Sequence, residues 1–321
     1  MERYTLNNTD LQVSKLCFGT MTFGGQTPEK ASIELIDAAL ADGLNFFDTA
    51  DMYNEGRAEE ILGKALSGKR ADVVLASKVY YPLHQDDSRG LSASRMREKL
   101  EGSLKRLNTD YLDIYYLHQP DRETSLNETL EALDTFKKEG KIRYYGVSNF
   151  AAWQIAEMFS VADRLGVDRP VVTQNVYNAL TRGIEAELMP FCQENQLPIH
   201  AYNPLAGGLL TGKYSKTGVD MKGRLMTDEK YNKRYMSLRS LAATKELIDV
   251  ARQVGRHIVE LMLLWVYQDP RIASMIIGVS NLSQYRQNMA YLRSEPLSVS
   301  AMEKVSAVGE AHYDRGFDYF R

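Results

Sequence analysis

Apolar and polar positions follow two alternating patterns along most of the chain. Short runs rich in β-branched and aromatic residues predict strands, and apolar residues spaced three or four apart predict the helices between them. The predicted strands span residues 15–18, 44–47, 73–76, 112–117, 142–147, 171–173, 199–201 and 275–277. Strands separated by helices form parallel sheets with right-handed crossovers. Because eight such units close a barrel, we predict an α/β fold of the (β/α)8 TIM-barrel type, with an open doubly wound sheet as the alternative.

Two regions break this alternation. Residues 3–14 have the pattern of a β-hairpin, with Asn7 and Asn8 as its turn. Residues 203–240, after the seventh predicted strand, form a long insertion rich in glycine, lysine and tyrosine. Long loops inside compact domains are often lids or binding loops, so we expect this segment to be one or the other. Neither region has the composition of a linker, and residues 1–321 are predicted to form a single domain.

Local signals mark where two of the helices begin. Thr27 followed by Pro28 predicts a helix cap with proline at the first helical position. Ser125, followed three residues later by Glu128, predicts a capping box in which each side chain bonds the backbone of the other residue.

Composition and charge exclude several classes of protein. Apolar residues make up 44% of the 321 residues and charged residues 25%, as in ordinary globular enzymes. The net charge of −3 argues against a nucleic-acid-binding protein, which usually has a basic excess. The cysteines Cys17 and Cys192 are too few for a disulfide framework and indicate a reducing compartment. Since neither a membrane-spanning stretch nor a signal-peptide core is found, we expect a cytoplasmic protein.

Three chemically active residues stand at the ends of predicted strands. Asp48, Lys78 and His118 each follow an apolar run and precede a polar loop. In a parallel barrel the carboxyl ends of the strands share one rim, so residues far apart in the sequence meet there. Tyr53 lies five residues after Asp48 and can join them. We therefore expect a carboxylate, an amine, an imidazole and a phenol to converge on one site.

This combination suits the reduction of a carbonyl group coupled to proton transfer. A free phenol holds its proton too tightly to donate it well at neutral pH, but a neighbouring ammonium such as Lys78 favours the phenolate. Asp48 can hold Lys78 by an ion pair, and His118 can hydrogen-bond a substrate carbonyl. Taken singly, each residue also has a purely structural interpretation. Asp48 could cap a helix, Lys78 could be a solvent-exposed residue at a strand end, and Tyr53 could be an aromatic residue in a loop. We interpret the four as catalytic because they lie together on adjacent strand ends.

Later strand ends carry groups suited to holding a cofactor. Ser148 and Asn149 close the fifth predicted strand, and Gln174 closes the sixth. Their hydroxyl and amide groups can donate hydrogen bonds to a carboxamide and accept hydrogen bonds from it. Tyr202, at the end of the seventh strand, offers a flat face to an aromatic ring. Asn149 alternatively caps the helix that follows it.

Residues 207–214 nearly match a phosphate-binding loop. The segment matches the Walker A motif at every position except the last. There, Tyr214 replaces the Ser or Thr that coordinates Mg²⁺. We therefore exclude a nucleotide triphosphatase, although a glycine-rich backbone with Lys213 can still hold a pyrophosphate. No G-x-G-x-x-G motif occurs, which argues against a Rossmann domain. No metal is expected, because metal-site spacing is absent from the remaining histidines, His84, His200, His257 and His312.

These motifs resemble those of the aldo-keto reductases. The matching segments are Phe47-Asp48-Thr49-Ala50 with Tyr53, Ala76-Ser77-Lys78, Leu117-His118 and Gly146-Val147-Ser148-Asn149. The resemblance covers essentially the whole chain. It implies a TIM barrel, a nicotinamide cofactor bound without a Rossmann fold, and a catalytic tetrad of Asp48, Tyr53, Lys78 and His118.

Longer segments resemble the aflatoxin aldehyde reductase branch of that family, namely residues 116–121, 148–153, 177–182, 202–214 and 319–321. Members of that branch are NADPH-dependent reductases of aldehydes and dicarbonyls and are commonly dimers. The resemblance therefore implies a small carbonyl substrate and a homodimer. The residues that it assigns to the cofactor are Ser148, Asn149, Gln174, Tyr202, Asn203, Pro204, Leu205, Gly207, Leu209, Lys213, Gly278, Ser280, Gln284 and Asn288.

Two arginines are expected to recognise charge. Many aldo-keto reductases carry Lys or Arg early in the loop that corresponds to residues 278–288 and holds the adenosine phosphate, whereas this chain does not. We expect Arg224 to supply that charge for NADPH, with NADH as the alternative cofactor. Arg321 ends an aromatic tail, and we expect it to bind a substrate carboxylate, which arginine can bond through two parallel hydrogen bonds.

Three functions fit these residues. The leading one is NADPH-dependent reduction of aldehydes, especially carboxylate-bearing or dicarbonyl aldehydes, with Tyr53 as proton donor. A slow-turnover redox-sensing or regulatory subunit, like the potassium-channel β-subunits of this family, would keep the same fold and tetrad. A sugar or alcohol dehydrogenase working in the oxidative direction would use the same residues, because the reaction is reversible.

Overall fold

Eight parallel strands close into a barrel within the residues that the computed structural model describes, 1–85, 87–214 and 223–312. Each strand pairs with the next along the chain, and the last pairs with the first to close the ring. The predicted TIM barrel is confirmed, and the open-sheet alternative is wrong. The barrel strands are β3 (Leu16–Gly19), β4 (Phe46–Asp48), β5 (Val74–Val79), β6 (Leu112–Leu117), β7 (Ile142–Ser148), β8 (Thr173–Val176), β9 (Ile199–Tyr202) and β10 (Ser274–Ile277).

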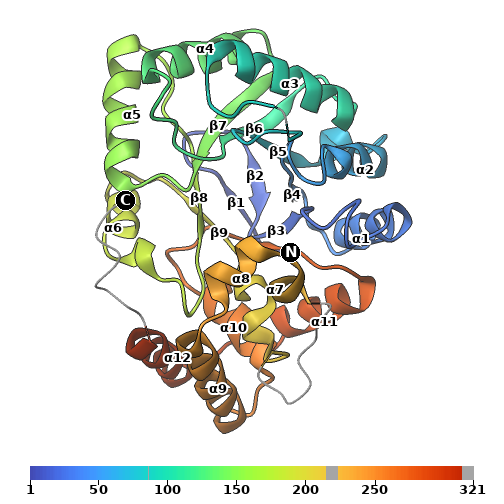
Figure 1. Ribbon diagram of the computed structural model, residues 1–321, viewed down its shortest axis with the longest axis vertical. Helices are drawn as coiled ribbons and strands as arrows, with labels where there is room; N and C mark the ends of the chain where they lie inside the picture. The colour runs from blue at the N-terminus through green and yellow to red at the C-terminus, as the bar shows by residue number, and fades with distance from the viewer. Residues whose placement is uncertain (86, 215–222, 313–321) are drawn as a thin grey trace.

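Helices surround this barrel on its outer side (Figure 1). The strands from β3 to β8 are each followed by one of the helices α1 (Glu29–Ala41), α2 (Arg57–Ala65), α3 (Ala93–Leu107), α4 (Leu126–Lys138), α5 (Ala152–Leu165) and α6 (Leu188–Glu194). Short 3-10 turns η1 (Arg70–Asp72) and η2 (Gly183–Glu185) precede β5 and α6. The remaining long helices are α9 (Leu238–Gln253), α10 (Ile258–Tyr267), α11 (Leu282–Leu292) and α12 (Val299–His312).

The predicted hairpin closes the amino end of the barrel. Its strands β1 (Arg3–Thr5) and β2 (Gln12–Ser14) pair antiparallel, and Asn8 in the turn has a left-handed backbone with φ of 59°. Leu6, Leu11 and Val13 pack against Cys17 on β3 in the cluster that fills the barrel interior. The hairpin therefore seals the end of the barrel opposite the rim on which the strands finish.

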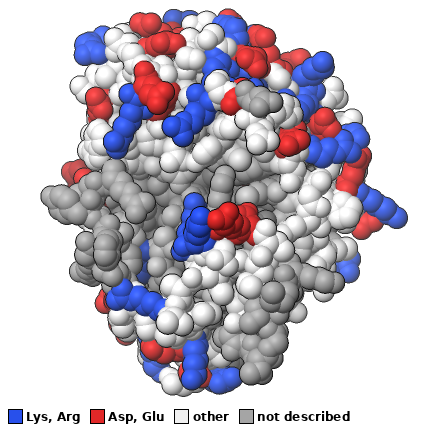
Figure 2. All heavy atoms as spheres, viewed as in Figure 1, with Lys and Arg blue, Asp and Glu red and all other residues white. Residues whose placement is uncertain are grey.

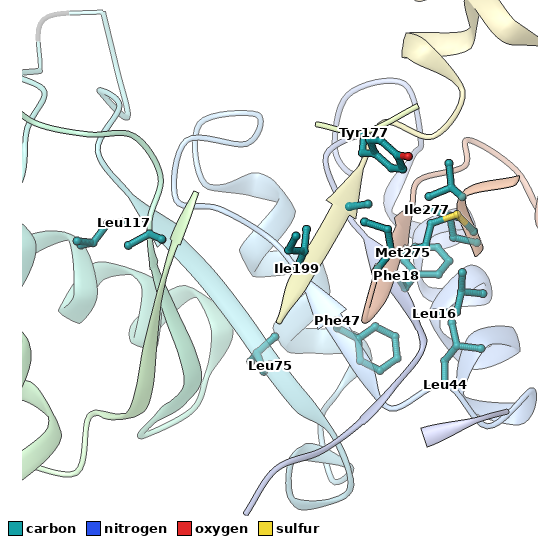
Figure 3. Packing of buried hydrophobic residues seen from close by; sticks show 14 of the residues in the cluster. Leu16, Phe18, Leu44, Phe47, Leu75, Leu117, Tyr177, Ile199, Met275 and Ile277 are labelled. Atoms are coloured by element: carbon teal, nitrogen blue, oxygen red, sulfur yellow. The ribbon is translucent and has the colours of Figure 1, made fainter. Parts of the chain in front are cut away.

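The strands separate two hydrophobic clusters. Side chains alternate along a strand, so one set faces the helices and the other faces the barrel interior. Figure 3 shows part of the larger cluster, to which Leu16, Phe47 and Leu117 belong. Burying each such side chain contributes about 1.5–3 kcal/mol. This double packing holds the strand ends, and the residues on them, in fixed positions.

Several local predictions about element boundaries are wrong. β8 begins at Thr173 rather than residue 171, and Gln174 lies inside it instead of closing it. Pro28 occupies the helix cap position of α1 rather than the first helical position. Ser125 precedes α4, but its side chain makes no capping hydrogen bond, and Glu128 instead accepts a bond from the Ala93 backbone at 2.8 Å. Contacts between elements therefore override the local capping pattern.

The long segment after β9 contains short helices. It folds as η3 (Ala206–Thr211), α7 (Arg224–Thr227) and α8 (Glu229–Tyr235) before α9 begins. Tyr214, at the position that broke the Walker A spacing, is buried, and its hydroxyl accepts a hydrogen bond from the Leu225 backbone at 3.2 Å. That tyrosine ties the glycine-rich turn to α7.

Charged side chains of both signs share the outer surface. On the face drawn in Figure 2 they gather around α3 and α4 and thin out towards the middle. Arg97 on α3 pairs with Glu139 at 2.8 Å, and Lys141 pairs with Glu101 at the same distance. In the part of the chain that the structure describes, no helix has both the length and the apolar character needed to cross a membrane.

Candidate active site

Asp48 and Lys78 form a buried ion pair at the carboxyl end of the barrel. Asp48 ends β4, and Lys78 is the next-to-last residue of the neighbouring strand β5. Asp48 is 3% exposed and Lys78 is 0% exposed. The Lys78 ammonium donates to one carboxylate oxygen of Asp48 and, at 2.7 Å, to the backbone carbonyl of Thr49. These partners fix the ammonium in place and offset the large cost of burying its charge.

Tyr53 and His118 join this ion pair on the same rim. The Lys78 nitrogen lies 3.4 Å from the Tyr53 hydroxyl and 5.1 Å from the centre of the Tyr53 ring. His118 directly follows β6, and its ring centre lies 6.1 Å from that of Tyr53 in an edge-to-face arrangement. The structure thus brings Tyr53, from the loop after β4, together with the three residues that the sequence placed at separate strand ends.

His118 is a neutral imidazole in this environment. Burial and, to a smaller degree, the nearby Lys78 ammonium hold the pKa of His118 well below its usual range. A neutral imidazole has one N–H donor and one acceptor nitrogen. Its buried Nδ1 has no hydrogen-bond partner among the described residues, and the Tyr81 ring packs against the imidazole at 5.1 Å between centres. The imidazole can therefore hydrogen-bond a carbonyl oxygen without adding positive charge.

Gln174 connects the sixth strand of the barrel to the ion pair. Its Nε2 donates to the second carboxylate oxygen of Asp48 at 2.8 Å. A carboxylate only accepts hydrogen bonds, which fixes which end of the amide faces Asp48. The amide oxygen of Gln174 consequently turns away from the ion pair.

Asn149 links His118 to the seventh strand. Its backbone is left-handed with φ of 63°, and its Nδ2 donates to the His118 carbonyl and to Ser148 Oγ, both at 3.0 Å. The Tyr202 hydroxyl donates to Asn149 Oδ1 at 2.7 Å. Asn149 does not cap the next helix, since Ala151 occupies the cap position of α5. Amides, hydroxyls and an aromatic face thus lie together beside the tetrad.

The glycine-rich turn after β9 packs against α8. Asn203 has φ of 60° and donates to the Tyr235 hydroxyl at 3.3 Å. Gly207 has φ of 66°, and a Cβ there would lie 2.7 Å from the Tyr231 ring, so only glycine fits. Of the remaining predicted cofactor residues in this turn, Pro204 and Leu209 are buried, while Leu205 and Lys213 are partly exposed.

The loop after β10 carries the residues expected near an adenosine phosphate. Gly278 directly follows β10, and Ser280 donates from its backbone and hydroxyl to Gln284 Oε1 at 3.2 and 3.0 Å. Asn281 caps α11 by accepting from the Gln284 backbone at 2.9 Å, and Asn288 is buried within that helix. These groups follow β10, the strand that closes the barrel beside β3.

The two predicted charge-recognising arginines fall largely outside the described residues. Arg224 begins α7, but its side chain is not among the described atoms, and Arg321 lies beyond residue 312. Their expected roles stay predictions. In the described part of the chain, no group of three His, Cys, Asp or Glu side chains is arranged to hold a metal ion.

Two residues at the mouth of the site were missed by the sequence reasoning. Tyr81 follows Lys78 by three residues and contacts His118. Arg234 on α8 has its guanidinium carbon 5.8 Å from the centre of the Tyr231 ring, and its positive charge acts on the hydroxyls of Tyr202 and Tyr81. The spacing of Tyr231 and Arg234 does predict a shared helix face. It does not predict which part of the barrel that face meets.

A third missed residue, Asp51, lies three positions after Asp48, and its backbone N–H donates to the Lys78 carbonyl at 3.4 Å. Its side chain is fully buried, and burial together with the nearby Glu59 carboxylate raises the pKa of Asp51 to about 7. One carboxylate oxygen accepts from the Met52 backbone at 2.7 Å, and the other has no hydrogen-bond partner among the described residues. Its sequence context, directly after Ala50, gave no sign of this environment.

A parallel barrel with this cluster on its carboxyl rim belongs to a known family. The sequence profile described as "Aldo/keto reductase family" matches residues 15–310, and the chain belongs to that family of oxidoreductases. The resemblance noted from the motifs is thereby confirmed.

Individual relatives match nearly the whole chain. A "Probable voltage-gated potassium channel subunit beta" of Oryza sativa subsp. japonica is 35% identical over 327 residues, which cover 99% of this chain and 100% of that protein. "Uncharacterized oxidoreductase YrpG" of Bacillus subtilis is 38% identical over 303 residues, or 90% of each chain. "Aflatoxin B1 aldehyde reductase member 2" of Rattus norvegicus is 35% identical over 321 residues, covering 94% of this chain and 86% of that protein.

Proposed function

We propose that this protein reduces aldehydes to alcohols with NADPH and that Tyr53 donates the proton. The observation that carries the proposal is the contact of the Lys78 ammonium with both Asp48 and the Tyr53 hydroxyl. The cofactor, when bound, supplies a hydride to the carbonyl carbon. Lys78 stabilises the negative charge that develops on the Tyr53 oxygen as its proton passes to the carbonyl oxygen. Asp48 holds Lys78 in the position where it can act.

His118 orients the substrate in this proposal. Its pKa is lowered by burial, so the ring stays neutral and donates one hydrogen bond to the carbonyl oxygen. Because the ring lies edge-to-face with Tyr53, the same oxygen can receive the phenolic proton. Both donors then act on the atom at which negative charge accumulates.

The donor set beside the tetrad fits a nicotinamide ring and its carboxamide. Ser148, Asn149 and Gln174 would hold the carboxamide, and Tyr202 would stack on the ring. The left-handed glycines of η3 turn backbone amides in a way that suits a pyrophosphate. The groups assigned to the remaining parts of the cofactor are Asn203, Pro204, Leu205, Gly207, Leu209, Lys213, Gly278, Ser280, Gln284 and Asn288. Arg224 would select NADPH over NADH.

Carboxylate-bearing aldehydes are the proposed substrate class. Arg234 supports this proposal, because its charge reaches Tyr81 and Tyr202 at the mouth of the site. Arg234→Gln should raise KM for 2-carboxybenzaldehyde and leave benzaldehyde nearly unchanged, the pattern of lost binding rather than lost chemistry. Lys233→Gln is the matched control, since Lys233 is the adjacent exposed cation and pairs with Glu229. Equal effects on both aldehydes would argue against a carboxylate site at Arg234.

A slow-turnover regulatory subunit is the second candidate. It is favoured by the relatives named as potassium channel β-subunits, which match this chain from end to end. A panel of aldehydes assayed with NADPH and with NADH separates the candidates. Rapid multiple turnover supports the reductase, whereas tight cofactor binding with very slow turnover supports the regulatory subunit. Running the reverse reaction with alcohols and sugars measures the oxidative alternative.

We also propose a homodimer of single-domain subunits in the cytoplasm. Cys17 and Cys192 are both buried and unbonded, which suits a reducing compartment. Light scattering after size-exclusion chromatography measures the subunit number, and a monomer at micromolar concentration would contradict the dimer.

A further inference from the structure

A chain of hydrogen bonds crosses the barrel interior from the hairpin to the active site. The Tyr4 hydroxyl, on β1, hydrogen-bonds His200 Nε2 at 2.7 Å. The other ring nitrogen, Nδ1, hydrogen-bonds the Tyr116 hydroxyl at 2.9 Å. The side-chain amide of Gln174 donates to Asp48 at 2.8 Å and lies close enough to the Tyr116 hydroxyl to lower its pKa slightly as a hydrogen-bond donor. The ion pair is thus connected through three buried side chains to the opposite end of the barrel.

The barrel interior is shaped to accommodate this chain. Tyr116 and His200 have no exposed surface. Gly146 makes room for the Tyr116 ring, because a Cβ there would lie 2.6 Å from that ring and 2.7 Å from Val172. The neighbouring interior side chains, such as Ile114, are apolar. Buried polar groups cost free energy unless they are hydrogen-bonded, whereas apolar side chains would fill the same space without that requirement.

We infer that Tyr4, His200 and Tyr116 position the side-chain amide of Gln174 and so orient the oxygen that accepts the carboxamide N–H of a nicotinamide cofactor. This inference rests on the proposed function. Gln174 donates its two amide hydrogens to Asp48 and Tyr116, Tyr116 donates to His200 Nδ1, and His200 Nε2–H donates to Tyr4. Each donor from Gln174 to His200 then has an acceptor, and the amide oxygen of Gln174 is left to face a ligand.

The protonation states agree with that direction. Burial lowers the pKa of His200 to about 3, so its ring is neutral with one donor and one acceptor nitrogen. Burial, and to a lesser extent the Asp48 carboxylate, raises the pKa of Tyr116 well above its usual range, so its hydroxyl keeps its proton. Tyr116 and His200 are therefore positioning residues, because they act on the cofactor through Gln174.

The test compares Tyr116→Phe with Tyr115→Phe. Tyr115 is the next residue on β6, is equally buried, and donates its hydroxyl to the Met96 carbonyl at 3.3 Å on the outer side of the barrel. Each variant is titrated by fluorescence with NADPH and with its 3-acetylpyridine analogue, which lacks the carboxamide N–H. Tyr116→Phe should weaken NADPH binding about fivefold, as expected for one lost hydrogen bond, and leave the analogue unchanged. Tyr115→Phe should change neither.

Equal weakening of both cofactors by Tyr116→Phe, or no weakening of either, would overturn the inference while the reductase proposal stands. Failure of the parent protein to bind NADPH or NADH would instead defeat the proposed function. Nitrogen-15 NMR of His200 provides a readout that needs no cofactor. The imidazole should stay neutral with an unprotonated Nδ1 from pH 8 to pH 5, and Tyr116→Phe should shift the Nδ1 resonance. A histidine that titrates near pH 6.5, the ordinary value, would contradict the arrangement.

Discussion

Asp48→Asn removes the negative half of the buried ion pair while keeping the shape of the side chain. Lys78 is 0% exposed and Asp48 is 3% exposed, so water cannot replace the lost partner. The ammonium keeps only neutral acceptors, among them the Thr49 carbonyl at 2.7 Å. Removing one member of a buried pair costs about 3–5 kcal/mol, far more than an exposed pair contributes. We expect the free energy of unfolding to fall by about 3–5 kcal/mol.

Urea unfolding at pH 7, followed by tryptophan fluorescence, measures this loss. Glu229→Gln is the control, because Glu229 pairs with Lys233 while both side chains are at least 75% exposed, and it should change stability far less. Adding Lys78→Met to Asp48→Asn should restore much of the stability, since no unpaired charge is then buried. If Asp48→Asn were no more costly than Glu229→Gln, the ion pair would not be the desolvated pair that the structure shows.

Further variants test other parts of the molecule. Gly146→Ala places a Cβ 2.6 Å from the Tyr116 ring, so it should cost about 1–3 kcal/mol of stability; an unchanged thermal unfolding midpoint would contradict that packing. Asp51 has its pKa raised to about 7 by burial and Glu59, so the folded state binds a proton more tightly than the unfolded chain. The contribution of Asp51 to the free energy of unfolding therefore falls as pH rises from about 4 to about 7. In urea unfolding measured at a series of pH values, the Asp51→Asn variant should lose less stability over that interval than the parent protein does. Arg224→Ala should weaken NADPH binding and barely alter NADH binding in fluorescence titrations; equal weakening would remove Arg224 from the phosphate site. Arg321→Gln should raise KM for succinic semialdehyde but not for benzaldehyde, and equal treatment of the two would leave the tail without a role in substrate choice.

The barrel was predictable because its signal is local and repeated. Strands such as β6 are short apolar runs buried on both faces, and the helices between them show regular apolar spacing. The hairpin was predictable for the same reason, with asparagines in its turn. β8 was misplaced because Gln174 and Asn175 look like loop residues. They lie inside the strand because their polar groups are hydrogen-bonded there. Gln174 donates to Asp48 on β4 at 2.8 Å, and Asn175 accepts from Thr173 on the same strand at 2.7 Å.

The candidate site was predictable to the extent that the strand-end rule applies. Asp48, Lys78 and His118 meet because parallel strands finish on one rim, a fact that needs only their order in the chain. The chain through His200 and Tyr116 was not predictable. Those residues sit in ordinary strand segments, and their partners come from elements up to 196 positions away. The position of Arg234 was not predictable for the same reason, because Arg234 reaches the rim through packing between segments that are distant in the sequence.

Tyr53→Phe tests the central claim most directly. The substitution removes the hydroxyl that lies 3.4 Å from the Lys78 nitrogen and leaves the ring in place. The measurement is kcat for a reducible aldehyde together with the dissociation constant for NADPH, with Tyr111→Phe as the control for loss of a hydroxyl remote from the site. General acid catalysis contributes about 10²–10⁴-fold, so kcat should fall by that factor while NADPH binding is nearly unchanged. Turnover within about twofold of the parent would show that Tyr53 is not the proton donor.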